Sequence, residues 1–337
     1  MKLTPGKLKG MNAVADARGV IAAAAMDQRG SLSKSLAAAA KGKEVTAAMM
    51  EEFKVCVSRE LTPFASAILL DPEYGLPAAK ARAKNAGLLL AYEESGYDNT
   101  KAGRLPDLLP HLSAHRLQAD GADCVKVLLY YTPFDKPEVN DIKQAFIERV
   151  GAECRAVDIP FFLEFVGYDP AGGDEKGVEY ARLKPEIVGK TVAEFSKDQY
   201  GVDVLKIEIP VNTKCVEGIA AFQGKKAYGK AEALDHFRAV AAAARRPFIF
   251  LSAGVSNAEF NESLALAAES GVAFAGVLCG RATWKDGIAV YAGQGREAFE
   301  KWLRTEGRAN IEAVNRSLQA AKPWFAFYGA KSAAALA

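Results

Sequence analysis

Short, continuously apolar runs recur along the chain, and each of them ends in polar residues. Runs of roughly four to eight residues without alternation are typical of parallel strands whose two faces are both buried. Eight such runs cover residues 19–26, 65–70, 87–92, 124–131, 160–166, 202–209, 247–251 and 275–278. We therefore expect eight parallel strands.

The segments between these runs carry apolar residues at intervals of three and four, which is the spacing of one helix face. They predict helices over residues 47–61, 105–119, 142–150, 232–244 and 257–270. Asn257 is the predicted N-cap of the last of these helices. Two long connections, 169–200 and 211–230, are expected to carry additional structure, and the first of them is a candidate lid.

Strands that alternate with helices predict an α/β fold, and eight repeats of the pair predict a single (β/α)8 TIM barrel. One domain then spans residues 1–337, with residues 1–16 and 325–337 as extensions and the alanine-rich tail from residue 324 frayed. The alternative is a doubly wound open sheet. No GxGxxG motif follows the first run, and this disfavours that alternative.

The composition narrows the possible function classes. In 337 residues, 43 Lys and Arg against 41 Asp and Glu give a net charge of +2, which argues against nucleic-acid binding. No run reaches the ~18 apolar residues of a membrane helix, and residues 1–16 lack the apolar segment of a signal peptide, so we expect a cytoplasmic protein without a membrane partner. Five cysteines without a CxxC motif and three histidines disfavour a disulfide framework and a histidine-ligated metal site.

Three charged residues interrupt apolar strands, namely Lys126, Glu164 and Lys206. A buried charge is costly unless it is paired, so a structural ion pair between Lys126 and Glu164 is one interpretation. The other is chemical, because burial and a nearby cation both lower the pKa of a lysine and make its amine nucleophilic. Glu208 lies two residues after Lys206, so we expect both side chains to face the barrel interior.

The last two runs are followed by glycines and an arginine, in LSAGVS (251–256) and GVLCGRATW (276–284). Barrel enzymes often bind a substrate phosphate with the loops after their last two strands, using backbone amides. We expect Ser252, Gly254, Gly280 and Arg281 to bind one phosphate, with Arg281 supplying a bidentate charge. A glycine turn with an outer salt bridge is the structural alternative.

Several longer stretches give the chain a family resemblance. They are AMDQRG (25–30), ELTPFASAILLDPEYGL (60–76), LLLAYEESGYD (88–98), PFFLE (160–164), GVDVLKIEIPVN (201–212), LSAGVS and GVLCGRATW. On these stretches the chain resembles the class I tagatose 1,6-bisphosphate (diphosphate) aldolases of the tagatose 6-phosphate pathway. The departures are the N-terminal segment, a lysine-rich insert around residues 224–226 and the alanine-rich tail, none of which touches a motif position.

The resemblance implies a TIM-barrel lyase of carbohydrate metabolism that cleaves tagatose 1,6-bisphosphate reversibly to dihydroxyacetone phosphate and glyceraldehyde 3-phosphate. It implies a small-molecule phosphosugar substrate, no cofactor and no metal, and it leaves open a homo-oligomer such as a dimer. By the family motif, the Schiff-base lysine is Lys206 and the acid/base carboxylate is Glu164. An iminium on the lysine is the electron sink that cleavage beside a ketone requires.

Roles for the remaining polar residues follow from this mechanism. Lys126 would orient Glu164, and Asp27 would bind the sugar hydroxyls and take the proton of the cleaved alcohol. Gln28 and Arg29 complete the expected substrate site, with Arg29 as the candidate for the second phosphate.

Three rival functions remain. A sulfofructose 1-phosphate aldolase would share the lysine chemistry and differ only in its second anion site. A non-catalytic phosphosugar-binding barrel is disfavoured because Lys206, Glu164 and Lys126 are all present. A metal-dependent aldolase is disfavoured by the scarcity of histidine.

Overall fold

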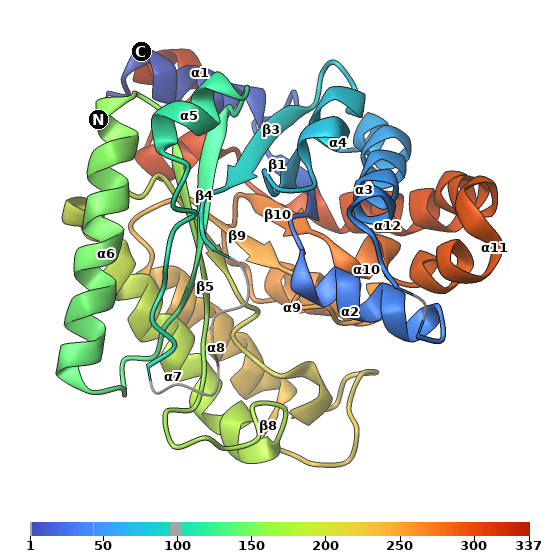
Figure 1. Ribbon diagram of the computed structural model, residues 1–337. Coiled ribbons are helices and arrows are strands. Elements are labelled where there is room, and N and C mark those ends of the chain that lie inside the picture. Colours follow the sequence, from blue (N-terminus) through green and yellow to red (C-terminus); the bar gives the residue numbers. More distant parts are fainter. Residues whose placement is uncertain (1, 43, 95–102) are drawn as a thin grey trace.

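A computed structural model describes residues 2–42, 44–94 and 103–337. In these residues eight parallel strands close into a barrel, with the neighbour order β1-β10-β9-β6-β5-β4-β3-β2 (Figure 1). The barrel strands are β1 (Ile21–Met26), β2 (Ala67–Leu70), β3 (Gly87–Ala91), β4 (Cys124–Tyr130), β5 (Phe161–Val166), β6 (Val204–Ile207), β9 (Phe248–Leu251) and β10 (Gly276–Cys279). Each strand overlaps one of the predicted apolar runs, so the predicted (β/α)8 barrel is confirmed.

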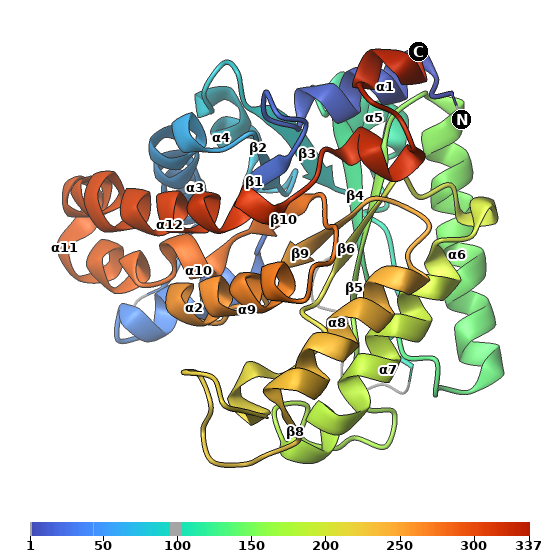
Figure 2. The ribbon, with the colours of Figure 1, turned by 180° about the vertical axis from the view of Figure 1, so that it is seen from behind.

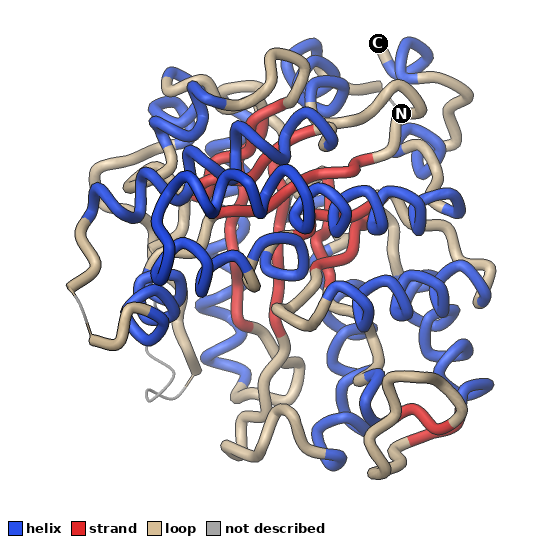
Figure 3. The backbone as a smooth tube through the Cα atoms, turned by 90° about the vertical axis from the view of Figure 1, so that its right-hand side faces the viewer, coloured by secondary structure: helices blue, strands red, loops and turns tan. Residues whose placement is uncertain are grey.

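Helices surround the barrel on its outer face (Figures 2 and 3). They are α1 (Pro5–Ala13), α2 (Gly30–Ala39), α3 (Ala47–Leu61), α4 (Leu76–Ala81), α5 (Ala114–Ala119), α6 (Pro137–Ala156), α7 (Val178–Phe195), α8 (Lys230–Ala243), α9 (Asn257–Glu269), α10 (Arg281–Trp284), α11 (Gly287–Trp302) and α12 (Arg308–Ser317). None of the described helices is long and apolar enough to cross a membrane.

Two helix predictions need correction. The predicted helix over residues 105–119 is wrong in its first half, because only Ala114–Ala119 is helical. Pro106 and Pro110 interrupt that half, and a proline cannot donate the hydrogen bond that a helix interior needs. The N-cap of α9 is Ser256 rather than Asn257, since the Ser256 side chain accepts a hydrogen bond from the Glu259 amide at 3.2 Å.

The two long connections differ in content. Residues 169–200 hold the outer helix α7, and the lid expected in this connection stays a prediction. Residues 211–230 do carry additional structure, a small parallel pair of strands, β7 (Val216–Glu217) and β8 (Tyr228–Gly229). Figure 1 places β8 at the end of the barrel that lies opposite the chain termini.

The chain termini close the amino-terminal end of the barrel. Figures 1 and 2 show both ends of the chain beside α1. Lys7 of α1 forms a buried ion pair with Asp203, which precedes β6, at 2.7 Å between Nζ and Oδ2. The predicted frayed tail is wrong, because Trp324 and Leu336 are buried and the Leu3 amide donates to the Leu336 carbonyl at 2.8 Å.

The barrel interior changes from apolar to charged along the strands. Its apolar layer includes Cys124 of β4, Phe162 of β5 and Val204 of β6. Side chains alternate between the faces of a strand, so the residues two positions further on point to the same interior. These residues are Lys126, Glu164 and Lys206. The register of the sheet sets Glu164 directly beside Lys206 on neighbouring strands.

Candidate active site

A cavity of about 550 Å³ opens at the carboxyl ends of the barrel strands. All ten residues that the sequence analysis assigned to the site line this cavity. They are Asp27, Gln28, Arg29, Lys126, Glu164, Lys206, Ser252, Gly254, Gly280 and Arg281. The fold therefore brings together residues that come from six strands and the turns that follow them.

Glu164 and Lys206 form the centre of a buried charge network. Oε2 of Glu164 lies 2.7 Å from Nζ of Lys206 and 2.9 Å from Nζ of Lys126. The Lys126 ammonium also contacts Oδ2 of Asp27 at 2.8 Å and Oε1 of Glu93 at 2.6 Å. Lys126 is 1% exposed and Lys206 is 3% exposed. Burial makes these charges depend on one another, because the protein interior screens charges much less than bulk water does.

The charges of the network set the protonation of its members. Burial lowers the pKa of Lys126, but the carboxylates of Asp27, Glu164 and Glu93 outweigh burial and hold this pKa well above its ordinary value. Burial raises the pKa of Asp27 and of Glu164, but the ammonium groups of Lys126 and Lys206 outweigh it and hold both pKa values below the ordinary range. Lys126 is therefore a cation, and Asp27 and Glu164 are carboxylates, near neutral pH.

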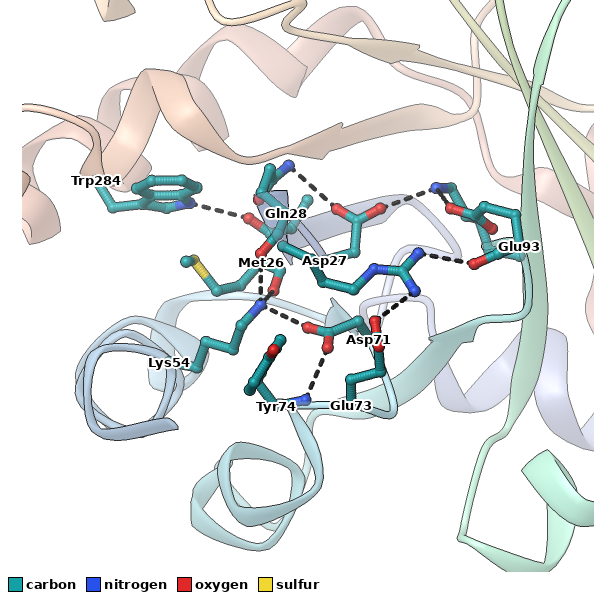
Figure 4. A network of polar contacts seen from close by, with 12 residues as sticks. Met26, Asp27, Gln28, Lys54, Asp71, Glu73, Tyr74, Glu93 and Trp284 are labelled. Carbon is teal, nitrogen blue, oxygen red and sulfur yellow. Dashed lines mark hydrogen bonds and ion pairs between the residues drawn. The ribbon is translucent and has the colours of Figure 1, made fainter. Parts of the chain in front are cut away.

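Arg29 lines the cavity, but its guanidinium already has partners. Nη1 lies 2.8 Å from Oε2 of Glu73, and Nη2 donates to the Glu93 carbonyl at 2.7 Å. Figure 4 draws both contacts at the labelled Glu73 and Glu93. The side chain thereby ties the end of β1 to the turns after β2 and β3. The charge that the sequence analysis assigned to a second phosphate is thus already compensated by Glu73.

The loops after β9 and β10 form a different environment. Ala253 and Gly254 both have positive φ, 47° and 79°, and a Cβ on Gly254 would lie 2.7 Å from Cζ of Arg281. Consecutive residues in such conformations turn successive amides toward one side, which favours an anion there. Arg281 makes no ion pair with the described residues, so its charge is available to a ligand.

Other polar residues of the cavity were given no role from the sequence. Glu93 lies two residues after the end of β3, so the rule that selected Asp27 could have selected it. Tyr130 lies two and four residues beyond Leu128 and Lys126, and alternation along β4 turns all three inward. Lys34 reaches the cavity from α2, one helical turn after Gly30.

The interior position predicted for Glu208 is wrong. Strand β6 ends at Ile207, and Glu208 pairs with Lys184 of α7 at 3.1 Å. The same carboxylate accepts a hydrogen bond from the Gly167 amide at 2.8 Å. Alternation along a strand no longer applies once the strand has ended, so Glu208 lies outside the cavity lining.

Neither metal-binding clusters nor disulfides are found in the described part of the chain. No group of three or more His, Cys, Asp or Glu residues there is arranged to hold a metal ion. All five cysteines are free and buried. The described segment also ends within the family stretch 88–98, so its residues 95–98 lie outside the described residues.

Comparisons with known proteins identify the family of the chain. A model of the DeoC/LacD family of aldolases matches residues 21–286. The chain is 52% identical over 330 residues to the tagatose 1,6-diphosphate aldolase of Listeria monocytogenes serotype 4b (strain CLIP80459), covering 98% of this chain and 96% of that protein. It is 53% identical over 327 residues to tagatose 1,6-diphosphate aldolase 2 of Enterococcus faecalis, covering 97% and 98%.

Among solved structures, an archaeal fructose 1,6-bisphosphate aldolase has the same fold, with a TM-score of 0.58 at 14% identity over 91% of this chain and 98% of that one. A Schiff-base-forming fructose-1,6-bisphosphate aldolase matches with a TM-score of 0.54 at 14% identity over 91% and 99%. At such identities the likeness concerns the fold. The family model and the two relatives of about half identity show that the chain is a lyase that belongs to the DeoC/LacD aldolase family.

Proposed function

We propose that this enzyme is a class I aldolase that reversibly cleaves tagatose 1,6-bisphosphate to dihydroxyacetone phosphate and glyceraldehyde 3-phosphate. The observation that carries the proposal is the buried Lys206 amine, 2.7 Å from the Glu164 carboxylate. The same cavity holds Arg281, which forms no ion pair with any described residue. The names of the relatives from Listeria and Enterococcus support the choice of sugar.

Formation of the iminium needs a neutral amine and a proton donor, and Glu164 can supply both. It first takes a proton from the Lys206 ammonium, with which it shares a hydrogen-bond distance. The neutral amine adds to the ketone carbon and gives a carbinolamine. Glu164, now an acid, protonates the carbinolamine hydroxyl, water leaves, and the iminium and the Glu164 carboxylate remain.

Cleavage then uses the other carboxylate of the network. Asp27 takes the proton of the hydroxyl on the carbon that becomes the aldehyde, and the electron pair of the broken carbon–carbon bond moves into the iminium. The resulting enamine needs a proton on carbon, which Glu164 delivers. Water then adds to the iminium, the carbon–nitrogen bond breaks, and dihydroxyacetone phosphate and the Lys206 amine are released. Lys126 contacts both carboxylates, so its ammonium can give a proton to Glu164 and regain one from Asp27.

Each of the two phosphates finds a cation, in segments that follow the neighbouring strands β10 and β1. One phosphate binds Arg281 and the backbone amides around Gly254 and Gly280, on the loops after β9 and β10. The second binds near the start of α2, where Lys34 lines the cavity and makes no ion pair with the described residues. Arg29 contributes less than Lys34, because Glu73 already compensates its charge.

Reductive trapping tests this proposal. Borohydride in the presence of dihydroxyacetone phosphate reduces an iminium to a stable amine, and peptide mapping then locates the label. We expect the label on Lys206, and no label in a Lys206→Met variant. A label on Lys126, or none on the wild type, would refute the assignment.

Two further measurements test the reaction class and the sugar. A chelator should leave the cleavage rate unchanged, and loss of activity that zinc restores would assign a metal-dependent mechanism instead. The value of kcat/KM for tagatose 1,6-bisphosphate should exceed that for sulfofructose 1-phosphate. The reverse order would identify sulfofructose 1-phosphate as the better substrate and would leave the proposed role of Lys206 unchanged.

A further inference from the structure

A second buried ion pair lies behind the cavity and has no part in the proposed chemistry. Lys54 of α3 and Asp71, which follows β2, are both fully buried, and Nζ of Lys54 lies 2.5 Å from Oδ2 of Asp71. Neither residue lines the cavity. Burial of two charges is costly and often contributes little net stability, so the pair calls for a reason beyond stability.

The remaining contacts of Lys54 supply that reason. Its ammonium donates to the Met26 carbonyl at 2.7 Å and to the Gln28 carbonyl at 2.8 Å, the two carbonyls that flank Asp27. With Asp71 these acceptors use all three protons of the ammonium. Figure 4 shows the two carbonyls converging on Lys54, while the Asp27 carboxylate points away from Lys54 toward the charge network.

Both ends of this arrangement are themselves anchored. The second oxygen of Asp71 accepts a hydrogen bond from the Tyr74 amide at 2.8 Å, which fixes the carboxylate in the turn after β2. On the other side, Nε1 of Trp284 donates to the Ala25 carbonyl at 2.9 Å (Figure 4). Side chains from α3 and α10 thus hold the main chain on both sides of the point where β1 ends.

We propose that Lys54, held by Asp71, is a positioning residue that fixes the main chain around Asp27 so that its carboxylate meets Lys126 and the substrate. The proposal rests on the role given to Asp27 in the proposed function. An apolar side chain could fill the same space, but it could not hold the carbonyls of Met26 and Gln28, on either side of Asp27, at one point. Lys54 therefore acts on cleavage through Asp27 and leaves iminium formation at Lys206 intact.

The test removes both buried charges together, because loss of one partner alone would leave an unpaired buried charge. In the full-length enzyme, Lys54→Met with Asp71→Asn should lower kcat for cleavage by about a hundredfold, the size expected when a catalytic group is misplaced by about 1 Å. Borohydride trapping of dihydroxyacetone phosphate should stay at the wild-type level. If the double variant does not fold, Lys54→Gln with Asp71→Asn takes its place, since an amide can serve only two of the three acceptors.

A mutant cycle with Asp27→Asn separates positioning from general stability. If Lys54 acts through Asp27, adding the two Lys54 and Asp71 changes to Asp27→Asn lowers kcat by no more than about threefold further, because coupled residues are not additive. Losses that multiply, or trapping that falls with kcat, would overturn the proposal.

A matched control is the buried pair of Lys7 and Asp203, which lies at the opposite end of the barrel from the cavity. Lys7→Met with Asp203→Asn should lower the melting temperature and leave kcat unchanged. An equal loss of kcat in this control would also overturn the positioning role. Failure of the proposed function would be recognised separately, because borohydride trapping would then place no label on Lys206 of the wild-type enzyme.

Discussion

One oxygen atom, Oε2 of Glu164, serves two ammonium groups at once, and this arrangement decides what a single substitution does. It lets the carboxylate exchange a proton with Lys206 while Lys126 holds it in place. A neutral carboxamide of the same shape can keep the position but cannot take up and release a proton in turn. A Glu164→Gln substitution therefore separates the effect of the side-chain position from the effect of proton transfer.

Glu164→Gln should lower kcat by about 10²- to 10⁴-fold, the usual contribution of a general acid/base. Steady-state kinetics with tagatose 1,6-bisphosphate measure this change, and the affinity for dihydroxyacetone phosphate should change little. Glu208→Gln is the matched control, because Glu208 is a buried carboxylate near the same strand ends that lies outside the cavity lining. A Glu164→Gln turnover within a few-fold of wild type would reduce Glu164 to a structural partner of Lys126.

Arg281→Ala tests the phosphate site. Loss of a charge-assisted hydrogen bond costs about 1.5–3 kcal/mol, or roughly ten- to a hundredfold in the KM of a phosphosugar. Unphosphorylated dihydroxyacetone should be affected much less than its phosphate, because it has no anion for the guanidinium to bind. Equal losses for both ligands would mean that Arg281 supports the fold instead.

Sequence reasoning found the residues of this site whose charge stands out against an apolar strand, as Lys126, Glu164 and Lys206 do. It could not find Lys54, because a lysine in an amphipathic helix looks like a surface residue. Its burial depends on how α3 packs against the end of β1, and that packing is not written in local sequence. Glu208 was assigned to the interior wrongly, because the alternation of side chains along β6 does not continue past the end of the strand at Ile207.

Among the elements, the loop between β9 and α9 depends most on one residue. Gly254 has a φ that side chains with a Cβ rarely adopt, and the space where a Cβ would stand is filled by Arg281. The loop and the arginine therefore fit together only with glycine at this position.

Gly254→Ala should raise the KM for phosphorylated substrates by about tenfold or more, because the new methyl group displaces the guanidinium as well as straining the backbone at a cost of about 1–2 kcal/mol. Gly271→Ala is the matched control, since Gly271 has a similar φ of 75° and open space around it. That variant should lower the melting temperature without changing KM. Similar KM values for Gly254→Ala and wild type would exclude this loop from phosphate binding.

The elements themselves were predictable where one constraint dominates. A parallel strand that is buried on both faces is predominantly apolar, and all eight apolar runs are strands. Residues 105–119 misled because Leu108 and Leu112 have helical spacing, although Leu108 instead bridges to Glu93 in an extended segment. The prolines at positions 106 and 110 exclude a helix there, because each lacks the backbone N–H that a helix interior needs, whatever the spacing of the leucines.

At the scale of the whole molecule, the two ends of the barrel differ: the carboxyl end of the strands holds the charge network, and the amino end is covered by apolar side chains. The tail folds into 3-10 turns at Trp324–Tyr328 and Ala333–Leu336 and packs against the interior layer together with α1. Its alanine-rich composition gave no sign of this, because the partners of Trp324 and Leu336 lie at the far end of the sequence.

Removal of residues 330–337 should lower the free energy of unfolding by about 2 kcal/mol, the contribution of one buried leucine, and leave kcat unchanged. Thermal melting and steady-state assays measure the two effects. Removal of the exposed Ala337 alone is the control and should change neither. A fall in kcat would mean that the base of the barrel communicates with the cavity.

The Lys54–Asp71 pair has a practical consequence for changing the sugar preference of this enzyme. A directed-evolution library that randomises only the cavity wall would never sample these two positions, because neither contributes to that wall. Yet a substitution there would re-aim Asp27 without altering any side chain that the substrate meets. Libraries designed to change the stereochemical preference should therefore also vary Lys54 and Asp71.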